Sequence, residues 1–340
     1  MMNALTDYLI CLECHSDNQA LKENFLACTQ CRHQVKIENH IPRYVDGEYH
    51  SNFGLQWNKF SKVQLDSVNG SDESEKRLLN QSNLSPEDFR GKTILEVGAG
   101  NGRFTEIFLK YGARVIAVDY SSAIDANLGN HLEYVKEGRL FLIQGDLFRL
   151  PVKQSAFDIV ICYGVIQHTG NNSKAISELS KYPKVQGRLL MDIYSTSIRH
   201  FNPIIYMIRP FFLCLKVSDQ KRLEIVERFV KSVFPLQLKI LKVLHRRTGI
   251  LRLIRYVVNR SPNSVYGINL FLDGKISIEN AYKWSVLDTF DGWAPKHDHP
   301  VSANQWKQLV FSLRDRGYKV DTIGWSGQGH TAVLTRTNED

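Results

Sequence analysis

Thr93-Ile-Leu-Glu-Val-Gly-Ala-Gly-Asn-Gly-Arg-Phe104 is the stretch that decides the fold. Residues 93–97 are a short β-rich apolar run that stops at glycines. Apolar residues then recur at helical spacing up to Gly112, and residues 114–118 form a second strand-like run. This order of strand, glycine turn, helix and strand predicts half of a βαβ unit. Asp119 follows the second strand at its carboxyl end, where open parallel sheets bind their ligands.

The spacing of the glycines separates two classes of ligand. Gly98, Gly100 and Gly102 let the backbone turn sharply and let a ligand approach the amides at a helix N-terminus. A nicotinamide dinucleotide prefers Gly-x-Gly-x-x-Gly, whereas this chain has Gly-x-Gly-x-Gly. Glu96 precedes the first glycine by two residues, and its carboxylate suits a cationic ligand better than a pyrophosphate. The pattern therefore disfavours a dehydrogenase.

At this point the chain resembles the class I S-adenosylmethionine-dependent methyltransferases, in particular those of type 11. Three more matches follow in order: residues 140–147, residues 156–168 and residues 187–192. The resemblance implies an α/β fold with a Rossmann-like, seven-stranded, mostly parallel sheet. It further implies that S-adenosylmethionine is bound by the following residues: Glu96, Gly98, Ala99, Gly100, Gly102, Asp119, Tyr120, Asp146, Leu147, Tyr163 and His168. In such a site the acid matching Asp119 holds the ribose hydroxyls and Asp146 faces the adenine. The alternative is a nucleotide-type fold that has lost its ligand.

Four cysteines near the N-terminus predict a metal site. Cys11-x-x-Cys14 and Cys28-x-x-Cys31 are separated by 13 residues, a spacing typical of four thiolates around tetrahedral zinc. Residues 1–45 are too few to build a core of their own, so metal binding would supply their folding energy. We expect a zinc ribbon with a structural or substrate-orienting role, and the alternative is a damaged ribbon without metal.

Length and composition favour one sizeable core with one or two additions, because the chain has 340 residues of which 43% are hydrophobic and 23% charged. The N-terminus shows no basic-then-apolar signal, and the longest apolar stretch, 203–217, is interrupted by Arg209-Pro210. We therefore expect a cytoplasmic protein. The net charge is +8, but residues 199–260 alone hold 14 Lys or Arg and three acids, a local +11 that leaves −3 for the rest.

That basic segment predicts a helical insertion after the fifth strand. Apolar residues at 223, 226, 229, 230 and 233 form a helical stripe, Pro235 is expected to interrupt it, and similar stripes continue to residue 257. We predict two or three amphipathic helices within 198–275. They are interpreted as a cap packed on the sheet or on a second subunit, as a recruiting surface for an anionic substrate, or as a peripheral contact with an anionic membrane. Residues 46–92 link the ribbon to the enzyme, and Gln56 and Trp57 are interpreted either as part of a lid or as packing against the sheet.

The C-terminal part, 276–340, returns to the core and carries the candidate catalytic groups. A helix is expected over 276–287, followed by a polar loop over 288–300, a helix capped by Ser302 and two final strands. The loop resembles a substrate-side loop of methyltransferases. Since histidine titrates near neutrality and a carboxylate can orient it, we rank His299 with Asp298 first as general base, ahead of His297 and Asp291. The alternative is a network that only stabilises the loop.

The sequence therefore predicts a methyltransferase with a cofactor-binding core over 93–197. The expected acceptor is a small molecule, a glycan or a lipid-linked intermediate, and anionic acceptors are among those expected. The methylated atom is expected to be oxygen or nitrogen. An RNA base methyltransferase is the first alternative, although the ribbon offers no basic aromatic surface. A non-catalytic cofactor-binding scaffold is the second.

Overall fold

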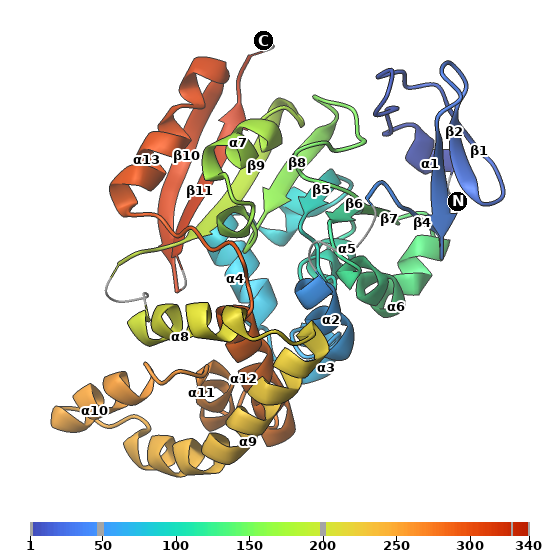
Figure 1. Cartoon of the computed structure of the whole chain (residues 1–340). Helices are drawn as coiled ribbons and strands as arrows, with labels where there is room; N and C mark the ends of the chain where they lie inside the picture. Colours follow the sequence, from blue (N-terminus) through green and yellow to red (C-terminus); the bar gives the residue numbers. More distant parts are fainter. Residues whose placement is uncertain (1–2, 46–50, 198–201, 328, 339–340) are drawn as a thin grey trace.

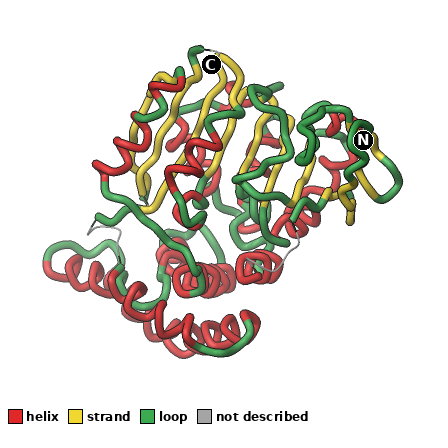
Figure 2. Tube along the Cα trace, turned by 45° about the horizontal axis from the view of Figure 1, so that its top comes forward, coloured by secondary structure: helices red, strands yellow, loops and turns green. Residues whose placement is uncertain are grey.

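The structure is a computed structural model that describes residues 3–45, 51–197, 202–327 and 329–338. Figure 1 shows a central twisted sheet with a ribbon of short strands beside one edge and a layer of helices below it. Figure 2 shows the same helical layer set apart from the strands. The layer and the sheet meet at the strand ends that carry the glycine turn.

The central sheet has the strand order β10-β11-β9-β8-β5-β6-β7. Its strands are β5 (Thr93–Val97), β6 (Arg114–Asp119), β7 (Leu140–Gln144), β8 (Phe157–Cys162), β9 (Pro183–Tyr194), β10 (Tyr318–Ser326) and β11 (Gly329–Arg336). Strands β5 to β9 pair in parallel, and β11 runs antiparallel to both of its neighbours. This arrangement confirms the predicted seven-stranded, mostly parallel sheet. All five residues of β5 are buried, Thr93 and Glu96 included, as expected for a strand covered on both faces.

Helices cover both faces of the sheet, and residues of each strand alternate between them. On one face Leu95 and Ile116 pack with side chains of α7 (Asn172–Leu179) and α13 (Ala303–Phe311). On the other face Ile94 and Val115 pack with α4 (Glu73–Ser82), α5 (Thr105–Lys110) and α6 (Ala123–Lys136). Short 3-10 turns complete this layer: η1 (Pro86–Phe89), η2 (Ile166–His168) and η3 (Arg314–Arg316). The result is the layered α/β architecture that the sequence predicts.

The helical layer has a hydrophobic core of its own. It contains α2 (Ser51–Lys59), α8 (Pro203–Cys214), α9 (Asp219–Leu244), α10 (Ile250–Val258), α11 (Tyr266–Leu272) and α12 (Ile278–Trp293). A further short helix, α3 (Asp66–Asn69), leads into α4. Among the described residues of 198–275, where two or three helices were expected, the structure has four: α8, α9, α10 and α11. None of the helices in the described residues has the length and apolar run needed to cross a bilayer.

Two local predictions are wrong. The helix α9 continues through Pro235, because the proline ring lies on an exposed side and the buried stripe from Leu223 to Leu241 holds both halves against the same core. Residues 288–293 are helical and not a loop, since α12 extends to Trp293. Its last turns are buried through Thr289, Phe290 and Trp293, so packing extends the helix beyond the polar residues that suggested an end.

The N-terminal ribbon is an antiparallel sheet with the order β1-β2-β3-β4. Its strands are β1 (Gln19–Leu21), β2 (Phe25–Cys28), β3 (Gln34–Glu38) and β4 (Ile41–Pro42), and α1 (Asn3–Thr6) precedes them. The ribbon lies along the edge strand β7, where Arg43 pairs in parallel with Gln144 and the Tyr44 amide donates to the Gln144 carbonyl at 2.8 Å. It thereby covers a strand edge that would otherwise be exposed.

The proposed domain boundaries remain predictions. The boundaries at 45/46 and 197/198 border residues 46–50 and 198–201, which lie outside the described residues.

Candidate functional site

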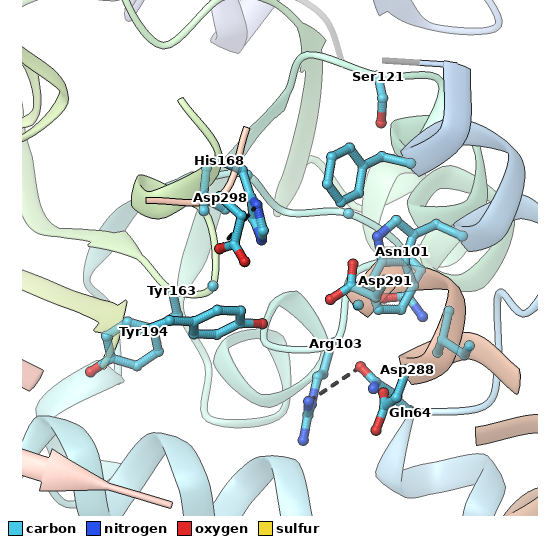
Figure 3. Close-up of a pocket in the computed structure, with 18 of the residues that line it drawn as sticks. Gln64, Asn101, Arg103, Ser121, Tyr163, His168, Tyr194, Asp288, Asp291 and Asp298 are labelled. Atoms are coloured by element: carbon cyan, nitrogen blue, oxygen red, sulfur yellow. Dashed lines mark hydrogen bonds and ion pairs between the residues drawn. The ribbon is translucent and has the colours of Figure 1, made fainter. Parts of the chain in front are cut away.

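A cavity of about 720 Å³ lies where the carboxyl ends of the parallel strands meet the helical layer. Its floor is formed by the turn after β5 and by the ends of β6, β7 and β8, and its other walls come from α2, α8 and α12. Figure 3 shows side chains from both layers pointing into this space. Of the predicted site residues, the cavity is lined by Gly98, Ala99, Gly100, Asp119, Tyr120, Asp146, Leu147, Tyr163, His168, Asp291 and Asp298.

The glycine turn has the backbone conformation that its sequence predicts. Gly98 and Gly102 have φ of +79° and +90°. A Cβ at Gly98 would lie 2.2 Å from Val165, and one at Gly102 would lie 2.5 Å from Asn127 and His131, so both positions require glycine for packing as well as for conformation. Gly100, with φ of +54°, faces the cavity, and its Cβ would lie 3.9 Å from the Trp57 indole. The turn therefore opens its backbone to a ligand at Gly100.

Asp119 lies at the end of β6, where both of its carboxylate oxygens accept hydrogen bonds. Its Oδ2 accepts a hydrogen bond from the Gly100 amide at 2.8 Å, and its Oδ1 accepts from the Ser121 amide and hydroxyl at 2.8 and 2.7 Å. Burial raises the pKa of Asp119, and these three donors oppose the shift. Asp146, at the next strand end, accepts from the Phe148 amide at 2.9 Å. The two acids thus line the cavity on neighbouring strands, in the order that the resemblance implies.

Glu96 lies below the turn and does not line the cavity. Its carboxyl is buried and accepts from the Thr105 hydroxyl at 2.5 Å. Burial, with a smaller contribution from nearby Asp119, raises the pKa of Glu96 to about 8, although the Thr105 hydrogen bond opposes the shift. Glu96 therefore ties β5 to the first turn of α5. This position suits shaping the glycine turn, and it does not suit direct contact with a ligand in the cavity.

Helix α2 covers the cavity from the side of the glycine turn. Phe53 and Trp57 line the cavity, and the Phe53 ring lies 5.4 Å from the His168 ring. Gln56 is buried and donates from Nε2 to Asp291 at 3.1 Å. Trp57 faces the cavity and Gln56 contacts the helix α12, so these two side chains do not show the expected packing against the sheet, and the lid stays a prediction.

His168 and Asp298 meet at the end of β8. The His168 Nδ1 lies 2.9 Å from the His297 carbonyl oxygen and 4.0 Å from Asp298 Oδ1. Because a carbonyl only accepts, Nδ1 carries the proton in the neutral ring and Nε2 keeps its lone pair. The Asp298 side chain is 2% exposed, and its Oδ2 accepts from Tyr206 and Arg209, each at 2.7 Å. The loop carbonyl and this carboxylate hold the imidazole at the cavity wall.

The expected pairing of His299 with Asp298 is not present. His299 is exposed, its ring stacks on that of His297 at 5.9 Å, and neither imidazole lines the cavity. Backbone hydrogen bonds fix this arrangement, because the His299 amide donates to the Gln167 carbonyl and the His299 carbonyl accepts from Asn172. Neighbouring side chains in an extended loop point to opposite sides, so the loop that directs Asp298 inward directs His299 outward.

Two half-buried arginines in the cavity wall were not found from the sequence. Arg77 of α4 donates to Asp192 at 2.7 Å and forms an ion pair with it. Arg103 donates to Ser74 and Gln64 at 2.8 and 3.2 Å, and in the part of the chain that the structure describes it forms no ion pair. Burial beside Arg77 lowers the pKa of Arg103 to about 10. Arg103 follows the glycine turn directly, but only the tertiary fold shows that it faces the cavity.

The four cysteines come together in the ribbon. Their sulfur atoms all lie within 4.8 Å of one another, and the Cys11–Cys31 and Cys14–Cys28 Sγ distances are both 3.5 Å. The Cys31 amide also points to the Cys28 sulfur at 3.5 Å. Four clustered sulfurs on two turns fit the tetrahedral geometry of a metal with thiolate ligands.

Comparison with known proteins adds an independent observation. Residues 95–191 match the family model described as a methyltransferase domain. A ubiquinone biosynthesis O-methyltransferase of Coxiella burnetii is 30% identical over 119 residues, which are 35% of this chain and 49% of that protein. A demethylmenaquinone methyltransferase of Thermobifida fusca is 28% identical over 120 residues, 35% of this chain and 51% of that protein. The chain thus spans about half the length of these curated relatives.

A solved O-methyltransferase family protein from Burkholderia thailandensis overlaps 78% of this chain and 57% of its own, with 12% identity and a TM-score of 0.42. The matched residues 95–191 run from β5 to β9 and contain the glycine turn, Asp119, Asp146 and His168. This region, with the seven-stranded sheet that holds it, is therefore similar to a methyltransferase domain.

Proposed function

We propose that the protein transfers a methyl group from S-adenosylmethionine to a hydroxyl or amine of a small molecule. The observation that carries the proposal is the single cavity wall shared by the glycine turn, Asp119 and His168. It combines a cradle for the cofactor with a candidate base. When bound, the cofactor supplies an electrophilic methyl group on a sulfonium.

The residues of the cavity fit the cofactor in sign and in shape. Gly100 leaves space beside its backbone, Asp119 presents a carboxylate for ribose hydroxyls, and Asp146 and Leu147 line the adjoining wall. The acids suit a cationic ligand, because a positive charge close to them is stabilised in a partly dehydrated cavity. Tyr163, whose buried hydroxyl has no hydrogen-bond partner among the described residues, offers a further polar contact.

His168 is the base that the geometry favours. Its Nε2 keeps a lone pair, and the ring lies between Phe53 and Tyr194, whose ring centroids are 5.4 and 5.7 Å away. In this position Nε2 takes the proton of an acceptor hydroxyl, while Asp298 stabilises the imidazolium. Asp291 and Asp298 line the same cavity and stay candidates for positioning the acceptor, whereas His297 and His299 lie outside the cavity.

The acceptor has a polar or anionic group in this proposal, because Arg103 faces the cavity and forms no ion pair in the described part of the chain. The cavity volume of about 720 Å³ suits a cofactor with a small acceptor and leaves little room for a folded RNA. The relatives named for ubiquinone and menaquinone biosynthesis also favour a small molecule. A lipid-linked or glycan acceptor fits if only its head enters.

We also assign Zn²⁺ to the four cysteines. Two thiolates from each turn complete a tetrahedral site with no open position, so the metal's role is structural. His15 and His33 are not needed as ligands.

The first experiment follows transfer of radiolabelled methyl groups from S-adenosylmethionine into a host extract, separated into lipid, small-molecule and nucleic-acid fractions. We expect label in the lipid or small-molecule fraction, and none with Asp119→Ala. Label that ribonuclease removes would favour the RNA alternative. If calorimetry detects no binding of S-adenosylhomocysteine to the wild-type chain, the assignment of the cofactor fails. The scaffold alternative is then unsupported as well, because it also requires that the cofactor binds.

A further inference from the structure

Exposed apolar side chains gather on two helices of the insertion. In α10, Ile250, Leu253, Ile254 and Val257 are 70%, 57%, 44% and 63% exposed. Their spacing places all four on one face of the helix, and no residue of α10 is buried. In α8, Met207 and Phe211 are 70% and 78% exposed. Large apolar groups held this far out of a core indicate a surface that contacts something else.

The exposed stripe of α8 lies opposite the face that lines the cavity. Ile205, Tyr206 and Arg209 contribute to the cavity wall, whereas Ile204, Met207 and Phe211 follow one another at helical spacing on the other side. The start of α8 and the end of α10 are joined, since Asn202 Nδ2 donates to the Ser261 carbonyl at 3.0 Å. We call the exposed apolar residues of the two helices the α8–α10 surface. Figure 1 shows both helices in the layer away from the ribbon.

The charged residues of the segment that contains α10 have a single sign. From residue 228 to residue 272 the sequence contains nine Lys or Arg and no Asp or Glu. Seven of these cations are exposed: Arg228, Lys231, Lys239, Lys242, Arg246, Arg247 and Arg252. None of the seven forms an ion pair with the residues that the structure describes. A helical face meant only for water normally mixes both signs of charge.

An anionic lipid bilayer matches both properties, and we propose that the α8–α10 surface docks on one. Aliphatic side chains enter the interfacial region of the bilayer while flanking cations contact lipid phosphates. A second copy of the chain would place like charges against each other. RNA would take the cations but would leave the aliphatic stripe exposed, because bases stack on aromatic side chains.

The position of the α8–α10 surface bears on the route by which the acceptor reaches the cavity. This step rests on the proposed function. Helix α8 is shared by the cavity and by the docking surface, so a docked protein holds its cavity beside the bilayer. An acceptor dissolved in the membrane then reaches Arg103 and His168 without crossing bulk water.

Sedimentation with vesicles tests the docking. The full chain is mixed with vesicles of phosphatidylcholine alone or of phosphatidylcholine with phosphatidylglycerol. We expect binding to the anionic vesicles, little binding to the neutral ones, and loss of binding at high salt. Replacing Leu253 and Val257 together by Glu should weaken binding by at least roughly tenfold, because two apolar contacts are lost and two repelling charges are added. Arg246→Glu and Arg252→Glu should each weaken it at least about fivefold.

Leu132→Glu is the matched control, since Leu132 is a similarly apolar residue, 39% exposed, on α6 of the cofactor-binding core. It should leave vesicle binding unchanged. S-adenosylhomocysteine binding should be unchanged in every variant, which separates a failed docking surface from a failed cofactor site. If the full chain fails to sediment with anionic vesicles, the proposal is overturned. A dimer that light scattering detects and the Leu253 and Val257 replacement abolishes would overturn it too, as would retention of RNA through the same residues.

Discussion

At the scale of single residues, Glu96 carries the clearest pH dependence. Its carboxyl is buried, so folding favours the protonated form and raises the pKa of Glu96 to about 8. The unfolded chain ionises near the ordinary glutamate pKa of about 4.3. Between these values the native state binds more protons than the unfolded state, and its free energy of unfolding therefore falls as pH rises, by at most about 1.4 kcal/mol per pH unit.

Glu96→Gln removes this titration and keeps an acceptor for Thr105. We expect the variant to gain stability relative to wild type as pH rises from about 5 to 8, measured by urea unfolding without ligand. A constant difference between the two proteins over that range would show that Glu96 ionises normally in the fold.

His168 and His299 can be distinguished by turnover. His168→Gln removes the proposed base but keeps a polar side chain, so we expect a fall in kcat of roughly a hundredfold or more, with S-adenosylhomocysteine binding changed little. His299→Gln should leave kcat near wild type, because the ring is exposed and outside the cavity. The opposite ranking would restore His299 as the base and remove the assignment made from the geometry.

At the scale of elements, the glycine turn between β5 and α5 supplies a matched pair of variants. Gly102→Ala places a Cβ 2.5 Å from Asn127 and His131 at φ of +90°. The backbone strain alone costs roughly 1–3 kcal/mol, and the clash adds to it. Gly100→Ala costs about 1 kcal/mol, since its φ of +54° is accessible to other residues and the nearest group is 3.9 Å away.

Thermal unfolding in the absence of ligand checks this difference. For S-adenosylhomocysteine binding we expect the reverse order: relative to the stability that each variant loses, Gly100→Ala should weaken binding more than Gly102→Ala. The reason is that Gly100 faces the cavity, whereas Gly102 faces the helix α6. Equal losses of melting temperature would contradict the packing role of Gly102.

The sequence predicted those elements whose signal is local. The apolar run over 93–97, its glycines and the acid at 119 correspond directly to β5, the turn and the end of β6. Contacts between distant elements decided the rest. Helix α9 continues through Pro235 and α12 continues to Trp293 because their apolar faces pack into a shared core, which no local pattern reveals. Arg77 and Arg103 reach the cavity from elements whose positions depend on the whole fold.

At the scale of the whole molecule, the ribbon and the cofactor core form one continuous structure. Arg43 leaves the ribbon, forms an ion pair with Asp125 at 2.5 Å and donates to the Gln144 side chain at 3.0 Å. Gln144 in turn donates to the Tyr120 carbonyl at 3.1 Å, beside Asp119. The Lys153 amide donates to the Tyr8 carbonyl at 2.8 Å on the other side of the ribbon. Ordering of the ribbon is therefore linked to the strand ends that form the proposed cofactor site.

Metal removal should consequently affect more than the ribbon. Chelation, or Cys28→Ser, removes the ligand bonds that replace a hydrophobic core in the first 45 residues. We expect close to one zinc per chain before treatment, a lower melting temperature after it, faster hydrogen exchange in β7 and weaker S-adenosylhomocysteine binding. Cys214→Ser is the control, because Cys214 is an exposed cysteine outside the cluster and its replacement should change none of these. A metal-free chain with unchanged melting and unchanged exchange in β7 would show that the ribbon folds without zinc, whereas faster exchange confined to residues 11–31 would separate ribbon stability from the cofactor site.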